Sequence, residues 1–330
     1  MKQNRNIIGA DIAKLSIELY CYKTKRSITI TNNTKGYNQF VKWIKEQKLS
    51  LKNVFVVMEY TGLYNYCFED FLFKKEISYH ITNALHIKMS LGVIRGKSDK
   101  LDAIRIAQFG FDKKLVLENS KTTSKTIKRL QMLQSTRDRL VKQRTGLKNA
   151  VKEYEHIQIP QKDIILKGQY RVITVMNQQI KKIEQEIEKL ITSTESLATN
   201  YKLLMSIKGV GPVLATETII KTRNFTKFTD SRKFACFCGT APFEHTSGTS
   251  VRGKTRVSKL ADKNMNKLLT TASFTAIQYN PEMKKYYERR VTSGKSKMST
   301  INIVRNKIIG RMFAVVKRQT PYVEIYQNVA

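Results

Sequence analysis

Four carboxylates stand beside apolar runs in a chain that has few acidic residues. Asp11 lies near the end of the run NIIGADI, and Glu59 ends the run VFVVME. Asp99 and Asp102 follow in KSDKLDAIRIAQFG, where a separation of three places both side chains on one face of a helix. Grouped at one sheet edge, such carboxylates would repel one another, and a hard divalent cation with oxygen ligands offsets that repulsion. The pattern predicts a Mg²⁺ site in which two ions stabilise the attacking and leaving oxygens of a phosphoryl transfer, with Mn²⁺ as the alternative ion.

Simpler interpretations exist for each of these residues. A single carboxylate is often a helix cap or one half of a surface ion pair. A strand of the form apolar-apolar-Gly-x-Asp, followed by a second strand, also begins the actin-like and sugar-kinase ATPases. No second glycine-rich phosphate-binding turn follows in the sequence, however, and a net charge of +34 is unusual for a metabolite kinase. Cleavage of nucleic acid is the better interpretation of the four carboxylates together.

A second candidate for chemistry is the hydroxyl-rich segment CGTAPFEHTSGTSVRGKTRVSK at residues 238–259. One of its hydroxyl groups could attack a phosphodiester while neighbouring cations neutralise the phosphate oxygens. The hydroxyl groups are those of Thr246, Ser247, Thr249 and Ser250, and the cations are those of Arg252, Lys254, Arg256 and Lys259. On composition alone the segment is equally a phosphate-binding loop without a nucleophile, and His245 is interpreted as structural.

The charge of the whole chain indicates a polyanionic partner. Its 330 residues include 60 Lys and Arg against 26 Asp and Glu, which gives a net charge of +34. Residues 201–330 contribute the largest share, with nine cations between 221 and 260. Such a surface binds nucleic acid through counterion release. A generally well-solvated surface is the plainer alternative, and an anionic membrane is the weaker competitor.

Nothing in the sequence indicates secretion or a membrane span. No apolar stretch approaches the ~20 residues of a transmembrane helix, and the start of the sequence lacks a secretory signal pattern. We therefore expect a cytoplasmic protein with no membrane partner. At 41% hydrophobic, the chain has enough apolar residues for packed domains. The four cysteines are scattered, so we predict that they are reduced and buried rather than paired or bound to zinc.

The first 112 residues predict an α/β domain that would position the four carboxylates. Strand and helix patterns follow in the order β-β-β-α-β-α-β-α. Two antiparallel connections and a right-handed crossover would place the strand that ends at Glu59 beside the strand that ends at Asp11, in the same direction. Both C-terminal ends would then lie at one edge of the sheet, where α/β proteins place their chemistry.

Two long helices are predicted between residues 119 and 204. Apolar residues recur every seven positions, first at Leu133, Leu140, Leu147 and Tyr154, then at Ile173, Ile180 and Ile187 and at Met176, Ile183, Leu190, Leu197 and Leu204. This spacing is typical of a coiled coil, formed either as an antiparallel hairpin within the chain or between chains. Arg137 and Arg144 stand in the first helix where apolar residues would be expected. A plain spacer and a dimerising arm fit this pattern equally well.

The last 125 residues predict a mainly helical unit. The segment SIKGVGPVLATETII has the form of a helix-hairpin-helix, whose turn at Lys208, Gly209 and Gly211 could offer backbone N–H groups to a phosphate. A Gly-x-Gly turn also ends many helices for conformational reasons alone. The amphipathic segment 301–319 is expected to pack in the core. We therefore predict three domains, at 1–115, 116–204 and 205–330, with α/β, coiled-coil and mainly helical structure.

Five short motifs occur in order along the chain: GADIAK, MEYTGLY, KSDKLDA, GVGP and GTAPFEHTSGTSVRGK, with the coiled-coil segment between the third and fourth. As an ordered set they resemble the DEDD transposases of the insertion-sequence one-ten family, which are related to Piv-type DNA invertases. The resemblance covers nearly the whole chain. It implies an N-terminal RuvC-like domain of the ribonuclease H fold, whose Asp11, Glu59, Asp99 and Asp102 bind Mg²⁺, and a C-terminal transposase domain.

The resemblance also implies a mechanism and partners. In the family, the serine of a Ser-Gly motif, here Ser247-Gly248, attacks DNA and holds it as a covalent phosphoserine. The family uses a structured noncoding bridge RNA that pairs with donor and target DNA, and works as tetramers joined by coiled coils. The expected protein is a site-specific DNA transposase or recombinase, nucleoid-associated in a prokaryotic cytoplasm. Its expected partners are double-stranded donor and target DNA, a bridge RNA, and further copies of itself in a dimer to tetramer.

Two other functions are compatible with the residues. A RuvC-like junction nuclease would use the carboxylates and a metal to hydrolyse DNA with water, and the segment around Ser247 would only grip the DNA. A non-catalytic nucleic-acid-binding protein would carry the carboxylates without using them. The sequence leaves open whether the acidic and serine sites meet within one chain or between chains.

Overall fold

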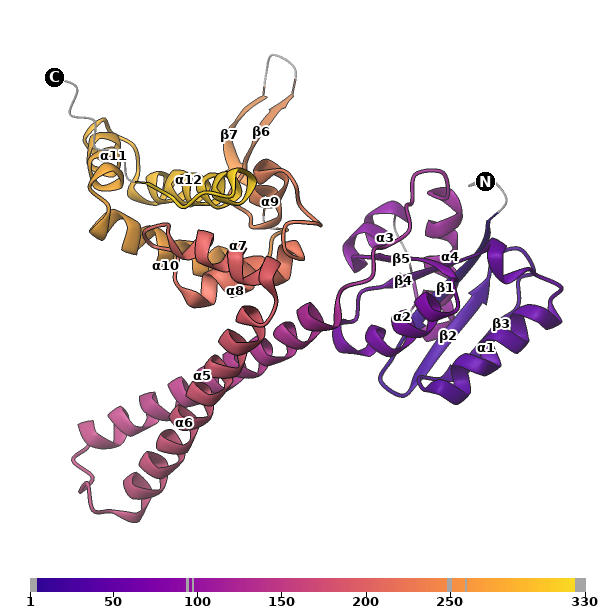
Figure 1. Ribbon diagram of the computed structural model, residues 1–330, viewed down its shortest axis with the longest axis horizontal. Coiled ribbons are helices and arrows are strands. Elements are labelled where there is room, and N and C mark those ends of the chain that lie inside the picture. Colours follow the sequence, from indigo (N-terminus) through magenta and orange to yellow (C-terminus); the bar gives the residue numbers. More distant parts are fainter. Residues whose placement is uncertain (1–4, 93–94, 97, 248–250, 259, 324–330) are drawn as a thin grey trace. The chain divides into compact units, whose positions relative to one another are not determined.

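The computed structural model describes residues 5–92, 95–96, 98–247, 251–258 and 260–323 (Figure 1). The chain divides into two compact units, Met1–Thr122 and Thr123–Ala330. Within the described residues, no helix combines the length and the apolar character needed to cross a membrane.

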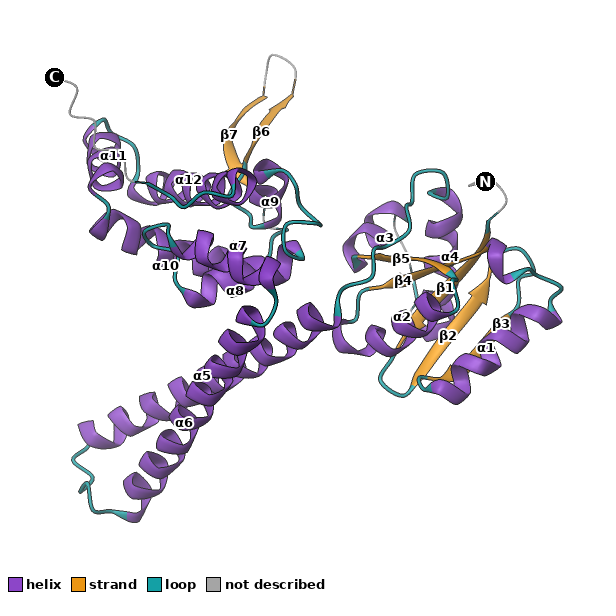
Figure 2. Cartoon of the chain, viewed as in Figure 1, coloured by secondary structure: helices purple, strands orange, loops and turns teal. Residues whose placement is uncertain are grey.

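The N-terminal unit is built on a five-stranded sheet (Figure 2). Its strands are β1 (Asn6–Ile12), β2 (Ser16–Cys21), β3 (Ser27–Thr31), β4 (Val54–Glu59) and β5 (Ser78–Thr82), in the order β3-β2-β1-β4-β5. The β1–β2 and β2–β3 pairs are antiparallel, whereas β1–β4 and β4–β5 are parallel. The predicted placement of the Glu59 strand beside the Asp11 strand, in the same direction, is therefore confirmed.

Helices cover both faces of this sheet. They are α1 (Thr34–Glu46), α2 (Asn65–Lys74), α3 (Ala84–Ser90) and α4 (Asp99–Asp112), with the short 3-10 helices η2 (Leu51–Asn53) and η3 (Gly62–Tyr64). Side chains alternate along a strand. Ile8 and Ala10 accordingly face the core that contains Phe40 of α1 and Phe68 of α2. The odd-numbered positions of β1 and β4 face α4 instead, where Ile7, Phe55 and Val57 pack with Ile106 and Phe109.

Glycines allow α4 to lie directly on the sheet. A Cβ on Gly9 of β1 would come 2.2 Å from the carbonyl oxygen of Ala103, and one on Gly110 would come 2.8 Å from side-chain atoms of Ile7 and Val57. Gly110, late in α4, thus meets Ile7, early in β1, whereas Ala103, earlier in α4, meets Gly9. α4 therefore runs antiparallel to β1, and its first turn lies at the C-terminal end of that strand.

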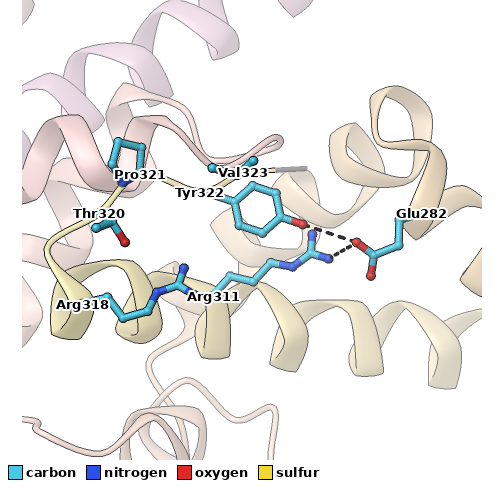
Figure 3. Close-up of a pocket in the computed structure, with 7 residues that line it drawn as sticks. All are labelled: Glu282, Arg311, Arg318, Thr320, Pro321, Tyr322 and Val323. Atoms are coloured by element: carbon cyan, nitrogen blue, oxygen red, sulfur yellow. Dashed lines mark hydrogen bonds and ion pairs between the residues drawn. The ribbon is translucent and has the colours of Figure 1, made fainter. Parts of the chain in front are cut away.

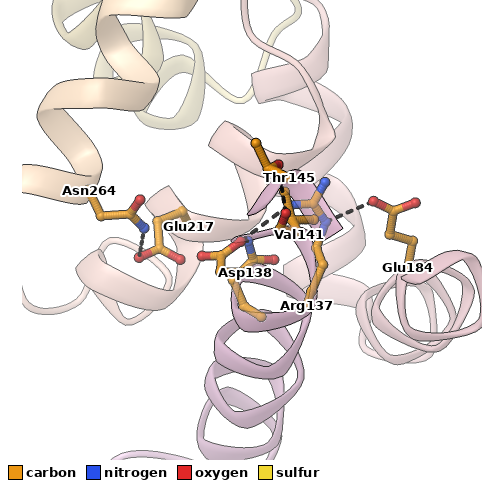
Figure 4. Close-up of polar contacts among 8 residues, drawn as sticks. Arg137, Asp138, Val141, Thr145, Glu184, Glu217 and Asn264 are labelled. Carbon is orange, nitrogen blue, oxygen red and sulfur yellow. Dashed lines mark hydrogen bonds and ion pairs between the residues drawn. The ribbon is translucent and has the colours of Figure 1, made fainter. Parts of the chain in front are cut away.

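The C-terminal unit begins with a helical hairpin of α5 (Lys125–His156) and α6 (Ile164–Thr192). Val151, Leu166 and Ile173 are buried between the two helices near the tip of the hairpin. The two arginines that interrupt the first heptad series bridge to α6. Arg137 Nε lies 2.7 Å from Glu184 Oε1 (Figure 4). Arg144 donates to the side chain of Asn177 at 2.8 Å. Within this chain the heptad pattern thus forms the antiparallel hairpin.

The second long helix is shorter than the heptad pattern predicted. α6 ends at Thr192, and a separate helix, α7 (Glu195–Met205), carries Leu197 and Leu204 into the C-terminal core. The break lies at Thr194, whose backbone is extended and whose carbonyl oxygen accepts hydrogen bonds from the N–H groups of Leu197 and Ala198. Expecting one helix to residue 204 was wrong because the seven-residue spacing continues by coincidence across this break.

The rest of the C-terminal unit packs around one long helix. Its helices are α8 (Pro212–Thr222), α9 (Ser231–Phe237), α10 (Lys263–Tyr279), α11 (Pro281–Thr292) and α12 (Lys297–Arg318). Val304, Ile308 and Met312 of α12 are fully buried, which confirms that segment 301–319 packs in the core. A hairpin of β6 (Pro242–Ser247) and β7 (Val251–Val257) stands where the sequence indicated only a loop.

The described chain ends against α11 and α12 (Figure 3). Glu282 Oε2 accepts hydrogen bonds from Arg311 at 2.7 Å and from the Tyr322 hydroxyl at 3.3 Å, and the Arg311 guanidinium lies 4.6 Å from the centre of the Tyr322 ring. The Tyr322 N–H also donates to the Ser206 hydroxyl. These contacts fix the segment after α12 to the helical core.

The four cysteines are free thiols, and two of them are not buried as predicted. Cys21 and Cys238 are buried, whereas Cys67 is exposed and Cys236 is half-buried. Cys67 lies on the outer side of α2, because the adjacent Phe68 takes the position that faces the sheet.

Candidate catalytic site

Asp11 and Glu59 lie at neighbouring positions on two parallel strands. The register pairs Ala10 of β1 with Met58 of β4, so Asp11 and Glu59 are the next residues on each strand. Alternation along the strands places both on the face covered by α4, the face that Val57 also occupies. The prediction that these two carboxylates share the C-terminal edge of the sheet therefore agrees with the backbone.

Asp99 and Asp102 reach the same place from the first turn of α4. The helix begins at Ser98, whose hydroxyl accepts a hydrogen bond from the Leu101 N–H at 3.2 Å. The contact between Gly9 and Ala103 then holds this first turn against β1. Three separate elements, β1, β4 and α4, thus bring the four carboxylates together.

The pKa of Asp11 is raised in part by this grouping of carboxylates. Burial, together with the negative charges of Asp102, Asp99 and Glu59, raises the pKa of Asp11 from 3.8 to about 6. A proton or another cation close to Asp11 is therefore favoured. Among the described residues, no three carboxylate, imidazole or thiol groups already stand in a metal-binding arrangement. The carboxylates would have to turn toward a shared ion to bind it.

The donor set fits a hard divalent cation. All four groups offer oxygen, which is the ligand that Mg²⁺ prefers, and they carry enough negative charge to offset the cost of dehydrating the ion. Their mutual repulsion adds to burial in raising the pKa of Asp11, and a bound cation would offset it.

Arg105 is a site residue that the sequence interpretation missed. Its Nη1 lies 2.9 Å from Asp102 Oδ1, while Nη2 donates to the carbonyl oxygens of Arg95 at 2.9 Å and Gly96 at 3.0 Å. It therefore orients Asp102 and fixes the backbone that leads into α4. An arginine one helical turn after Asp102 was the available signal.

Asn65 fixes the backbone that follows Glu59. This fully buried side chain donates to the Glu59 carbonyl oxygen at 2.8 Å and accepts from both the N–H and the hydroxyl of Thr61. It closes the turn that follows β4, in which Gly62 has a φ of 78°. These contacts fix the backbone from which the Glu59 side chain projects.

The predicted serine segment is only partly described. Ser247 is the last residue of β6, and its backbone pairs with Val251 of β7. The side chains of Ser247, Arg252 and Lys254 lie outside the described residues, as does the whole of Lys259. Arg256 is exposed on β7, opposite Phe243. The nucleophile assignment stays a prediction.

The α7–α8 turn has a structural explanation for one of its glycines. Gly209 has a φ of 95°, and a Cβ there would come 2.5 Å from the carbonyl oxygen of Ala272 in α10. This close packing requires glycine with or without a phosphate. Lys208 is exposed, and Gly211 precedes Pro212 at the start of α8. Phosphate contact by this turn stays a prediction.

Two lysines of the basic stretch 221–260 contact other side chains of the C-terminal unit. Lys221 is 2.9 Å from Asp262 Oδ2 and 3.4 Å from Glu217 Oε1, and Glu217 also accepts a hydrogen bond from Asn264 (Figure 4). Lys227 lies beside the Phe228 and Phe237 rings, and burial lowers its pKa. Lys221 is therefore paired with carboxylates of its own chain, whereas Lys227 stays exposed beside the two rings.

Comparison with known proteins identifies two matching regions in the chain, one in its N-terminal half and one in its C-terminal half. A family model described as "Transposase", for the DEDD type of IS110, matches residues 8–154, and the "Transposase IS116/IS110/IS902 family" model matches residues 201–288. The chain is 26% identical to the "Pilin gene-inverting protein" of Moraxella bovis, over 97% of this chain and 98% of that protein. It is also 26% identical to the "Transposase for insertion sequence element IS1111A" of Coxiella burnetii, over 73% of this chain and 70% of that protein.

The sheet order and the four carboxylates fit the RuvC-like class of domain. The similarity to the matched proteins shows that the chain is a DNA recombinase or transposase. It belongs to the IS110 family of DEDD transposases. A protein of this family acts on DNA and depends on a divalent metal.

Proposed function

We propose that Asp11, Glu59, Asp99 and Asp102 bind Mg²⁺ and form the catalytic site of a site-specific transposase. The observation that carries this proposal is the convergence of carboxylates from β1, β4 and α4 on Asp11, whose pKa they help to raise to about 6. When bound, the metal would supply Lewis-acid stabilisation of charge on the phosphate oxygens. The chain's own contribution is to aim the carboxylates, through Arg105 for Asp102 and through Asn65 for the turn at Glu59.

We further propose that Ser247 is the nucleophile. Its oxygen forms a bond to the phosphorus of a DNA phosphodiester, the serine proton is lost, and the bond from phosphorus to one sugar oxygen breaks as that oxygen takes up a proton. One phosphate ester replaces another, so the strand can be rejoined by the reverse exchange without ATP. The position of Ser247 at the end of β6, in a hairpin that also carries Arg252, Lys254 and Arg256, supports this role.

The remaining partners follow from charge and exposed apolar surface. The net charge of +34 supports the binding of a bridge RNA in addition to DNA. Ile164, Val172 and Val175 of α6 are exposed, which supports association between chains through the hairpin. In this proposal residues 1–115 carry the metal site and residues 116–204 join copies into a dimer to tetramer. Residues 205–330 carry the serine, with Lys208, Gly211 and Lys259 among the DNA contacts.

Trapping the covalent intermediate tests the serine. Labelled donor DNA is incubated with the protein and Mg²⁺, and the mixture is denatured and separated by electrophoresis. The proposal expects a protein–DNA adduct that disappears in Ser247→Ala and persists in Thr246→Ala. Metal-dependent nicking that survives in Ser247→Ala, with no adduct in the unaltered protein, would instead support a RuvC-like nuclease that uses water.

A further inference from the structure

The end of β1 opposite the carboxylates opens into a basic pocket. Arg5 and Asp11 are six residues apart along extended chain, which separates them by about 20 Å. The pocket has a volume of about 540 Å³, and its lining includes Arg5, Lys23, Lys25 and Lys114 together with the rings of Tyr22 and Phe111. Of the described residues that line it, none is acidic. We call these six residues the basic pocket.

Two of the lysines are held over a pair of stacked aromatic rings. The Tyr22 and Phe111 ring centres are 4.2 Å apart at an interplanar angle of 20°. Lys25 Nζ lies 3.6 Å from the centre of the Tyr22 ring, and Lys114 Nζ lies 4.3 Å from that of Phe111. Cation–π attraction therefore places two ammonium groups at one small site despite their mutual repulsion.

Arg5 is positioned independently of the lysines. Its guanidinium lies 4.1 Å from the centre of the buried Phe55 ring, and its Nη1 donates to the Leu117 carbonyl oxygen at 3.1 Å. In the described parts of the chain, none of the four cations of the basic pocket forms an ion pair with a carboxylate. The positive charge is thus gathered but not neutralised by the protein.

Lys25 stands at a backbone position that favours glycine or asparagine. Lys25 has a φ of 60°, in the left-handed region that favours glycine or asparagine, and its N–H donates to the Cys21 carbonyl oxygen in the tight β2–β3 turn. The turn would form more easily with glycine. A lysine at this position supplies the charge over Tyr22 that glycine would lack.

We propose that the basic pocket binds a single-stranded segment of nucleic acid. Uncompensated cations attract the phosphates, and the stacked rings of Tyr22 and Phe111 hold two of those cations in place. Cations gathered beside aromatic rings are a usual feature of a site for single strands. The volume is that of a pocket for one small ligand, which suits a single nucleotide unit. The distance of about 20 Å from Asp11 means that the bound segment is not the phosphodiester under attack. The inference extends the proposed function and does not depend on the metal or serine assignments.

Binding of short oligonucleotides to the full-length protein in EDTA tests the pocket. Fluorescence anisotropy compares the unaltered protein with the triple variant Lys23→Gln, Lys25→Asn and Lys114→Gln, in which asparagine suits the left-handed backbone. The control variant Lys35→Gln, Lys74→Gln and Lys75→Gln removes the same charge from exposed lysines elsewhere on the unit. We expect the pocket variant to bind a single strand about tenfold more weakly, with a salt slope that falls by as much as ~2, since each phosphate contact contributes ~0.7. The control should change affinity by less than about twofold.

The kind of polymer and the role of the aromatic pair are tested separately. Matched single strands of RNA and DNA show which polymer the pocket prefers, and a loss for either one supports the proposal. Phe111→Leu keeps the apolar contact but removes the ring that holds Lys114, and we expect it to weaken binding by about fivefold. Equal affinities for the pocket and control variants, or a loss confined to duplex, would overturn the proposal. If the triple variant has lost its circular dichroism spectrum, the comparison of Lys114→Gln with Lys74→Gln decides in its place.

Discussion

Gly9 of β1 lies in direct backbone contact with Ala103 of α4. A Cβ on Gly9 would come 2.2 Å from the Ala103 carbonyl oxygen and 2.5 Å from the Ala107 nitrogen. Because those atoms belong to a helix backbone, they cannot yield without moving α4. This contact sets how close Asp99 and Asp102 come to Asp11.

Gly9→Ala should therefore damage both stability and the site. We expect a loss of about 2 kcal/mol or more in the free energy of unfolding, because the added methyl overpacks the contact. Metal affinity should also fall, since the first turn of α4 moves away from β1. Gly146→Ala is the matched control: it lies in α5 with open space around it, and should raise stability by about 0.5–1 kcal/mol. Equal effects at the two positions would contradict the role of Gly9.

The raised pKa of Asp11 predicts a dependence of stability on pH in metal-free protein. Between its ordinary value of 3.8 and its folded value of about 6, the folded state holds a proton that the unfolded state releases. This contribution to stability is fully present below pH 3.8 and is lost as the pH rises through about 6. Asp11→Asn should hence be more stable than the unaltered protein at pH 7, and the advantage should shrink toward pH 4.

Urea unfolding in EDTA across this pH range checks the prediction. Mg²⁺ should then stabilise the unaltered protein and leave Asp11→Asn unchanged. Asp112→Asn, an exposed carboxylate at the far end of α4, serves as the control. Parallel stability profiles for the unaltered protein and Asp11→Asn would show that Asp11 is not perturbed as described.

Removal of Arg105 should weaken metal binding without unfolding the protein. Arg105→Ala frees Asp102 to rotate and releases the carbonyl oxygens of Arg95 and Gly96. We expect metal affinity to fall by about 10- to 100-fold, which is typical for the loss of a residue that orients a ligand. Arg105→Lys should recover only part of it, because one ammonium cannot reproduce the forked geometry. Titration calorimetry measures the change, with Lys100→Ala, an exposed neighbour on α4, as the control.

Lys221 is expected to be essential to the C-terminal core. Burial lowers its pKa, but Glu217 and Asp262 more than offset this and hold the ammonium charged. Lys221→Met would leave two carboxylates without their partner, at a cost of about 3 kcal/mol or more. Burial raises the pKa of Glu217, so part of that cost should disappear at acidic pH, where Glu217 takes up a proton. Lys233→Met at an exposed site should change thermal stability little, and an equally small effect at Lys221 would contradict this role.

The neighbouring positions of Asp11 and Glu59 could be predicted because they rest on general rules. Two apolar runs joined by a right-handed crossover become parallel neighbours, and both carboxylates then lie at the same edge. The approach of Asp99 and Asp102 to Asp11 also depends on the packing of Gly9 against α4. No pattern in the sequence around Gly9 predicts that contact. The ion pairing of Lys221 with Glu217 and Asp262 was equally hidden, because a count of basic residues carries no information on which side chains meet a buried carboxylate.

Other features were missed where local pattern and tertiary structure disagree. The β6 and β7 sequences, PFEHTS and VRGKTRV, are too polar to show the alternation of a half-buried strand, so the hairpin was read as a loop. The heptad spacing crosses the break at Thr194 because Leu197 keeps the seven-residue interval while packing in a different core.

Strand exchange on a plasmid that carries the coding region with its native flanks is the most direct test of the carboxylate site. The unaltered protein should exchange strands only when Mg²⁺ or Mn²⁺ is present. Asp11→Asn and Glu59→Gln should each abolish exchange while leaving the protein folded and able to bind DNA, and Asp112→Asn should behave as the unaltered protein does. Exchange that continues at the unaltered rate in Asp11→Asn or Glu59→Gln would contradict the assignment of these carboxylates to catalysis.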